Sequence, residues 1–233
     1  MAASTADVAG LVALGLPILC FDTCTILDIM RDPTRDTVRA HDQRAALDLL
    51  TAMETGPRLI GIIADQVRLE FISNVDGVAD ETEHSLKKLR TQLARMDDIV
   101  GVFGGVGRID LEHFHDYVAR TRAVVDRLMG SVRTIPQTPA IPSRALLRVN
   151  QVRTPARKGR DSMKDCVVIE SYLDFASSLR SAGLKSKIVF VSSNTRDYTG
   201  ETGRALKSDL AAEFGAIMEY APNLGAAKYS LGL

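Results

Sequence analysis

Four acidic residues, far apart in the chain, lie next to segments that are predicted to form strands or the helices around them. Asp22 ends the apolar run PILCFD, and Asp197 lies just beyond a second run, KIVFVS. Glu70 lies on the helix predicted after another strand, and Asp165 lies in the first turn of the helix that leads into KIVFVS. Carboxylates gathered in a partly dry cleft repel one another, and one takes up a proton unless a cation is bound. Oxygen ligands favour Mg²⁺ or Mn²⁺ over zinc, so these acids are candidate ligands of a hard divalent ion.

The elements that would position these acids alternate between strands and helices. The predicted strands are nearly continuously apolar, as expected of parallel strands that are covered on both faces. The predicted helices have apolar positions at three- and four-residue spacing. This order predicts a three-layer α/β/α fold with a central, mainly parallel sheet, in which ligands bind beyond the carboxyl ends of the strands. The strands are predicted at 17–22, 58–63, 187–192 and 216–220, and the helices at 37–54, 64–74, 164–182 and 204–214.

The strand signal disappears between about residues 76 and 152. Two charged, amphipathic segments at 81–100 and 110–132 predict helices, and the glycine-rich stretch GVFGGVG joins them. We therefore expect a single α/β domain over residues 1–233 with a predominantly helical insertion at about 76–152.

Composition limits the classes of protein that the chain can belong to. Lysine and arginine number 29, as do aspartate and glutamate, so any nucleic acid must be held by a local basic surface rather than by net charge. The three cysteines have neither CxxC spacing nor an even count, which argues against a structural zinc site and a disulfide framework and favours a reducing compartment. The N-terminal apolar stretch lacks a basic leader, and no segment approaches the roughly 18 apolar residues of a membrane span. We expect a cytoplasmic protein that does not bind a membrane.

The four acidic motifs resemble those of PIN-domain nucleases, and the larger bacterial members in particular. They read, in order, CFDTCTILD, ADQVRLEF, SMKDCVVIESYL and VFVSSNTRDY, within a resemblance that covers roughly residues 17–75 and 153–222. The resemblance implies that an acidic quartet holds one or two Mg²⁺ or Mn²⁺ ions and hydrolyses phosphodiester bonds, commonly in single-stranded RNA. The positions that match the quartet, both as catalytic residues and as metal ligands, are Asp22, Glu70, Asp165 and Asp197.

Further residues match positions that the family uses to bind substrate. Thr23 matches the hydroxyl residue after the first acid, and Asn194 matches a polar position near the last one. Cys24 departs from the family pattern, in which asparagine is common. The resemblance adds RNA as substrate, and an antitoxin protein and a second copy of the chain as candidate partners.

A basic run leads directly into the Asp165 motif. Cations beside an acidic metal site would hold phosphates that the carboxylates repel, although charge runs are also commonly plain solvated loops. From this run Arg157, Lys158 and Lys164 are the predicted substrate contacts; Arg153 and Arg160 complete it.

Structural roles compete with the catalytic ones. Asp22 could cap the helix that follows it, and Asp165 has the capping-box spacing from Ser162. Glu70 could be a solvated helix acid, whereas Asn194 and Asp197 lie in a turn-rich string. Two further carboxylates, Asp28 and Glu170, are predicted on solvated faces, and the four histidines are not predicted to bind metal.

Three functions remain open from the sequence. The first is a Mg²⁺- or Mn²⁺-dependent ribonuclease, of the kind found as a toxin in toxin-antitoxin pairs. The alternative is a catalytically silent PIN-like RNA-binding or scaffold protein. A phosphatase-type hydrolase is the third, although Cys24 occupies the place of the second acid of its DxD motif.

Overall fold

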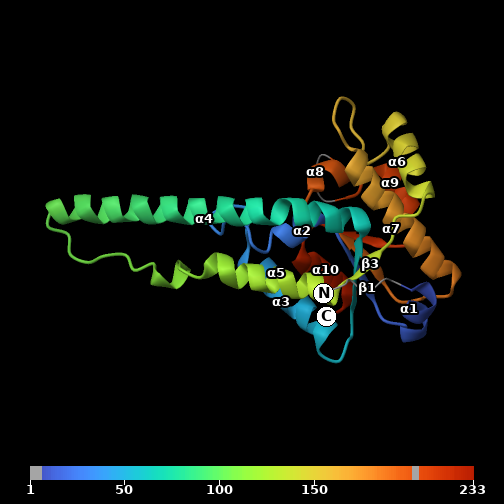
Figure 1. Cartoon of the computed structure of the whole chain (residues 1–233), viewed down its shortest axis with the longest axis horizontal. Helices are drawn as coiled ribbons and strands as arrows, with labels where there is room; N and C mark the ends of the chain where they lie inside the picture. Colours follow the sequence, from blue (N-terminus) through green and yellow to red (C-terminus); the bar gives the residue numbers. More distant parts are fainter. Residues whose placement is uncertain (1–6, 201–204) are drawn as a thin grey trace.

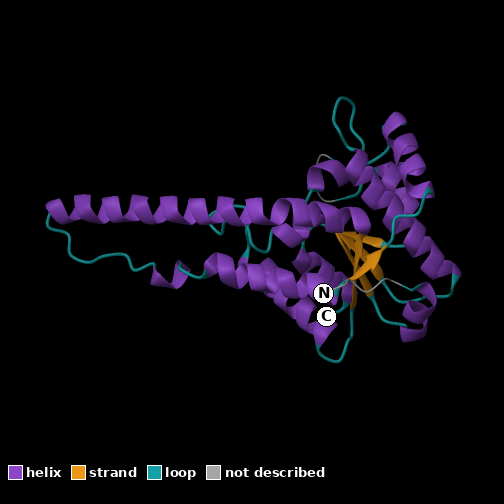
Figure 2. Cartoon of the chain, viewed as in Figure 1, coloured by secondary structure: helices purple, strands orange, loops and turns teal. Residues whose placement is uncertain are grey.

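The sheet at the centre of the fold is entirely parallel. The structure, a computed structural model, describes residues 7–200 and 205–233. Five strands lie in the order β3-β2-β1-β4-β5, with helices on both sides (Figures 1 and 2). This confirms the predicted three-layer α/β/α fold. The strands are β1 (Ile18–Phe21), β2 (Ile60–Ala64), β3 (Arg133–Ile135), β4 (Ile188–Val191) and β5 (Glu219–Ala221). The helices are α1 (Val8–Leu14), α2 (Thr23–Leu27), α3 (Ala40–Glu54), α4 (Asp65–Val102), η1 (Glu112–Phe114), α5 (Tyr117–Ser131), α6 (Ala140–Asn150), α7 (Met163–Ser181), α8 (Thr195–Tyr198), α9 (Ser208–Phe214) and α10 (Leu224–Leu231).

The four predicted strands are present but shorter, and β2 and β5 each end one residue later than predicted; the structure adds a fifth strand. β1, β2 and β4 are buried at every position, which is why their sequences are continuously apolar. β3 pairs with β2 at the edge of the sheet and buries only Ile135, so it leaves no apolar run in the sequence. The helix predicted at 204–214 corresponds to α9, and residue 204 lies outside the described residues.

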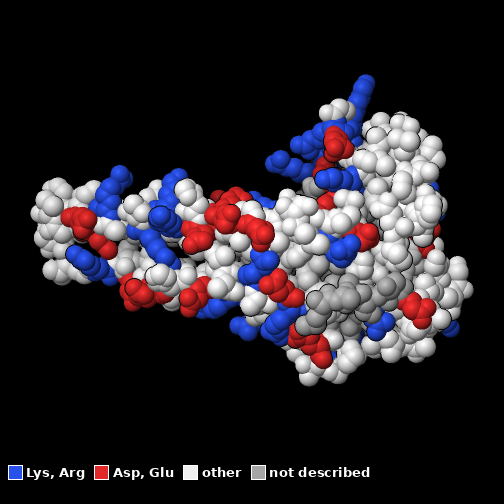
Figure 3. Space-filling view, viewed as in Figure 1, with Lys and Arg blue, Asp and Glu red and all other residues white. Residues whose placement is uncertain are grey.

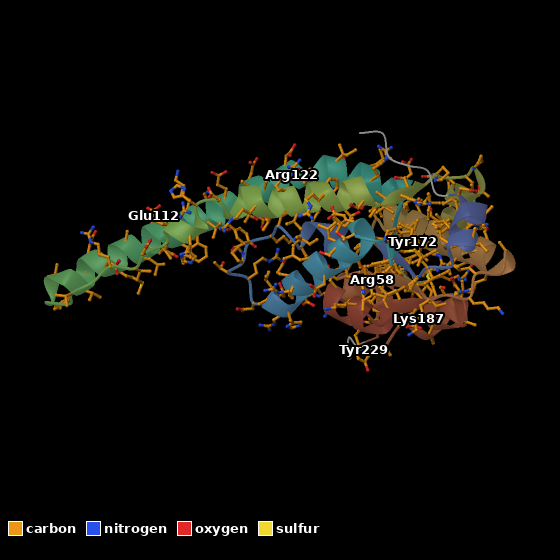
Figure 4. The ribbon with its side chains drawn as sticks, turned by 90° about the horizontal axis from the view of Figure 1, so that it is seen from below. Arg58, Glu112, Arg122, Tyr172, Lys187 and Tyr229 are labelled. Carbon is orange, nitrogen blue, oxygen red and sulfur yellow. The ribbon has the colours of Figure 1, made fainter. Side chains whose placement is uncertain are left out.

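Helices pack closely on both faces of the sheet. On one face, Tyr172 of α7 donates a hydrogen bond to the carbonyl of Phe21 and accepts one from the backbone N–H of Ala64 at 3.0 Å. Figure 4 shows Tyr172 inside the body of the molecule. On the other face α3 approaches the backbone of β2, because a Cβ at Gly61 would lie 2.4 Å from the sulfur of Met53. A larger residue here would have to displace Met53 and Val132, so glycine suits the close approach of this helix to the strand.

A long helical projection leaves the sheet between β2 and β3. The helices predicted at 64–74 and 81–100 are one continuous 38-residue helix, α4, and α5 returns beside it (Figure 1). Leu86 is the last buried residue of α4, and the rest of the helix and the loop after it are mostly exposed. Arg122 joins the two helices through an ion pair with Asp76 of α4 at 2.8 Å, and Figure 4 shows it between the body and Glu112.

A buried arginine connects three helices behind the basic loop at 151–162. Arg148 of α6 has 1% of its side chain exposed and pairs with Glu170 of α7, with an Nε–Oε1 distance of 2.7 Å. It also pairs with Glu213 of α9 and donates to the carbonyl of Thr154 at 2.6 Å. The prediction of a solvated Glu170 is therefore wrong: α6 packs on α7 and supplies the counter-ion that lets this carboxylate be buried.

Within 7–200 and 205–233, no helix combines the length and the apolar composition that crossing a bilayer requires.

Candidate active site

The strand order creates a crevice between the carboxyl ends of β1 and β4. The chain leaves β1 toward β2 and β3 on one side and later enters β4 on the other, so the connections diverge at this point. Open parallel sheets bind ligands at such switch points. Asp22 directly follows β1, and Asp197 lies on α8, which follows β4. Glu70 lies in the second turn of α4 after β2, and Asp165 lies in the first turn of α7.

Asp22 is held in a fixed orientation at the bottom of this crevice. It is 5% exposed, and its carboxylate accepts hydrogen bonds from the Thr23 N–H at 2.8 Å, the Cys24 thiol at 3.2 Å and the Ser192 hydroxyl at 2.5 Å. Burial raises the pKa of Asp22, the three hydrogen bonds oppose the rise, and the charge of Glu70 adds to it. Asp22 also caps α2 through the Thr23 N–H, so the structural and the predicted catalytic roles are compatible.

Cys24, at the position where asparagine is common in the family pattern, donates a hydrogen bond from its thiol to Asp22. Burial, followed by the charge of Asp22, raises the pKa of the Cys24 thiol to about 12. The thiol therefore stays protonated and donates to Asp22.

Asp165 lies within electrostatic range of the other three acids. Burial raises its pKa to about 7, with further contributions from the charges of Asp22, Asp197 and Glu70. Asp165 is therefore about half protonated near neutral pH, which is the outcome expected of crowded carboxylates without a cation. The capping-box alternative is not formed, since Ser162 makes no side-chain hydrogen bond at the start of α7.

The remaining two acids are held by neighbouring polar side chains. Glu70 accepts hydrogen bonds from Thr23 Oγ1 at 3.0 Å and from Gln66 Nε2 at 2.8 Å. Asp197 accepts one from Asn194 Nδ2 at 2.5 Å and forms an ion pair with Arg157 Nε at 2.7 Å. Thr23, Asn194 and Arg157 were predicted to bind substrate, and the structure places each in contact with an acid.

The other two predicted substrate contacts lie at the surface. Lys158, in the loop at 151–162, and Lys164, in the first turn of α7, are both exposed. Figure 3 shows lysine and arginine side chains gathered where this loop projects from the body. The loop also bends back to the site, because Arg157 donates to the carbonyl of Arg196 next to Asp197.

Most of the chain matches a known protein family. A family model described as PIN domain matches residues 19–198. The chain belongs to the PIN-domain family. No curated protein and no solved structure matches the chain. PIN domains are generally nucleases that use divalent metals, and the matched range contains all four acids together with the helical region between β2 and β3.

The PIN domain of this chain contains two site residues that were not predicted. Ser192 directly follows β4 and donates to Asp22, and its position at the end of a buried apolar run was the available signal. Tyr198 is fully buried, and its hydroxyl has no hydrogen-bond partner among the described residues. Burial, followed by the charges of Asp22 and Asp165, raises the pKa of Tyr198 well above its ordinary range. Its hydroxyl therefore lies within electrostatic reach of the acids, and nothing in the sequence distinguishes it from a core tyrosine.

The chemistry of the site fits a hard divalent ion, although the ligands are not arranged as a finished cage. Within the described ranges, no group of three His, Cys, Asp or Glu side chains has the arrangement to hold a metal ion. Arg157 forms an ion pair with the Asp197 carboxylate, and Gln66 and Thr23 donate hydrogen bonds to the Glu70 carboxylate. These contacts would have to loosen before the two carboxylates could bind a metal ion. The donors are carboxylate oxygens whose repulsion a cation would relieve, and Mg²⁺ and Mn²⁺ prefer such donors.

Proposed function

We propose that this PIN-domain protein is a Mg²⁺- or Mn²⁺-dependent nuclease that hydrolyses phosphodiester bonds in single-stranded RNA. The observation that supports it most is the position of the four acids around the switch point of the sheet, where burial and the charges of the other three raise the pKa of Asp165 to about 7. Four carboxylates near one switch point repel one another and lose hydration, which costs the folded protein stability. Acids whose pKa is shifted in this way are concentrated at functional sites.

The residues would divide the work by position. Asp22, Glu70, Asp165 and Asp197 would hold the metal, which would supply charge neutralisation and activation of a bound water. Ser192, Cys24 and the Thr23 N–H would keep the Asp22 carboxylate in one orientation. Arg157, Lys158 and Lys164 would contact the phosphate backbone. The Tyr198 hydroxyl, which is buried and has no partner among the described residues, would donate a hydrogen bond toward the acids from the core side of the site.

The second candidate function is a silent PIN-like protein that binds RNA or serves as a scaffold. The ion pair between Arg157 and Asp197 favours it, because an arginine can replace the charge of a metal in an inactive site. We also propose an antitoxin protein or a second copy of the chain as a partner. Exposed apolar residues at the end of the helical projection, among them Val102 and Phe103, offer contact area for it. The three free cysteines support a cytoplasmic location.

The test is cleavage of a mixed single-stranded RNA pool by the pure protein with Mg²⁺, Mn²⁺ or EDTA. Asp22→Asn and Asp165→Asn should each lower cleavage by at least about 100-fold, since they remove metal-binding charge. Asp80→Asn removes an exposed charge from α4 and should leave cleavage unchanged. If the wild type binds RNA but does not cut it with either metal, the binding-protein function replaces the nuclease.

A further inference from the structure

A cavity of about 740 Å³ lies next to the acidic site, on the side of Asp22 and Asp197. Its lining comes from the residues after β1, β4 and β5 and from the segment that joins α2 to α3. It shares Cys24 and Asn194 with the acidic site, but it contains no residue of the basic loop at 151–162. Its volume falls in the range of about 300–1,000 Å³ that is usual for ligand sites. The crevice therefore continues away from the acids on a side that the basic run does not reach.

Two arginines that line this cavity take part in no ion pair with another described residue. Asp28 is neutralised by Arg31, with a distance of 2.9 Å between Asp28 Oδ1 and Arg31 Nε, and the Asp42 carboxylate accepts the Gly225 N–H at 3.1 Å. Arg35 and Arg39 have no ion-pair partner in the described part of the chain, and both are exposed. Asp28, Asp36 and Asp42 equal the three lining arginines in number, so Arg35 and Arg39 are available to an anion because they form no ion pair among the described residues, and not because positive charge is in excess.

The start of α3 adds backbone donors to the same wall. Arg39 occupies the position before the helix, and no side chain caps the helix there. The first N–H groups of a helix have no partners within it, and they carry the positive end of the helix dipole. An anion next to Arg39 would therefore meet both the guanidinium groups and free backbone N–H donors.

We infer that this cavity binds the sugar-phosphate backbone of the RNA strand next to the cleavage point. The inference rests on the proposed function and extends it: the strand contacts the loop at 151–162 on one side of the acids and Arg35 and Arg39 on another. Asn194 lies between the acids and the cavity, since it donates to Asp197 and also lines the cavity wall.

The test measures binding without cleavage. Fluorescence anisotropy of a labelled single-stranded RNA 12-mer in EDTA compares the wild type with the double variant Arg35→Ala/Arg39→Ala. The matched control is Arg44→Ala/Arg58→Ala, which removes two exposed arginines that lie outside the cavity. The cavity variant should bind about tenfold more weakly. Its salt slope should fall by about 1.4, because each lost phosphate contact on a single strand contributes about 0.7. The control should stay within twofold of the wild type.

The outcomes separate this inference from the proposed function. Equal losses in the cavity and control variants, or no loss in either, would overturn the inference even if the wild type cuts RNA with Mn²⁺. Absence of RNA binding by the wild type would also overturn it. A selective loss in the cavity variant supports the inference even if no metal restores cleavage, and in that case only the nuclease activity fails.

Discussion

Replacing tyrosine by phenylalanine should have opposite effects at two buried positions of this protein. The Tyr198 hydroxyl is buried without a partner among the described residues, and burying an unpaired hydroxyl costs about 1–3 kcal/mol. Tyr198→Phe removes that cost and keeps the ring that packs edge-on against Phe190, with 5.3 Å between ring centroids. The variant should therefore be about 1 kcal/mol more stable than the wild type. For a chain of this length, that corresponds to a rise in Tm of about 2–4 °C.

The matched comparison is Tyr172→Phe, the same chemical change in the same core. The Tyr172 hydroxyl donates to the carbonyl of Phe21 and accepts from the N–H of Ala64, so its loss leaves two buried backbone groups unpaired. Each unpaired group costs about 1 kcal/mol or more, so this variant should lose at least about 2 kcal/mol. Urea unfolding followed by circular dichroism measures both free energies of unfolding.

Cleavage by the two variants then tests the role of Tyr198 at the site. If its hydroxyl supports the acids during the reaction, Tyr198→Phe should gain stability and lose at least about tenfold in the rate of RNA cleavage with Mn²⁺, a trade typical of functional residues. A Tyr198→Phe protein that is destabilised as much as Tyr172→Phe would refute the reasoning, because the hydroxyl would then have a partner in the folded protein. A stabilised variant that cuts RNA at the wild-type rate would remove Tyr198 from the site.

Three further predictions concern charged groups around the site. Arg148→Met leaves the buried Glu170 and the partly buried Glu213 without their main counter-ion and should cost about 3–5 kcal/mol in urea unfolding. Arg127→Met, at an exposed ion pair, should leave the urea midpoint nearly unchanged, and equal losses in the two variants would contradict the burial argument. Arg157→Ala frees the Asp197 carboxylate and should tighten Mn²⁺ binding about threefold in a paramagnetic-resonance titration, while it weakens RNA binding. An unchanged Mn²⁺ affinity would show that the ion pair does not compete with the metal. Burial raises the pKa of Asp209, but hydrogen bonds from Thr154 outweigh this effect and hold the pKa below its usual value. The ionised carboxylate therefore stabilises the folded protein at pH values above its unfolded pKa of about 3.9. The stability gap between wild type and Asp209→Asn should therefore shrink as the pH falls from about 5 through the folded pKa, and a gap independent of pH would rule out this linkage.

The fold could be predicted wherever one short segment contains its own signal. β1 and β4 bury every side chain, so an apolar run was sufficient to place them and the acids at their ends. β3 could not be predicted, because an edge strand of three residues with one buried side chain has no pattern of its own. The buried Glu170 could not be predicted either, since its burial depends on Arg148 from another helix. Tyr198 stands out only because its buried hydroxyl has no hydrogen-bond partner among the described residues. That cannot be predicted from the sequence, because it depends on which groups surround the hydroxyl in three dimensions.

The pairing of β1 with β4 also sets when the site can exist. Ile18 pairs with Ile188, 170 positions later, whereas Ile18 and its other partner, Ile60, are close in the chain. Closing a loop of that length costs about 4–5 kcal/mol of chain entropy before any contact repays it. At about 5–20 residues per second, a ribosome needs about 10–30 seconds after making β1 before it makes β4. A growing chain therefore carries Asp22 without Ser192 for most of its synthesis, and no N-terminal fragment that stops before β4 can contain the assembled site.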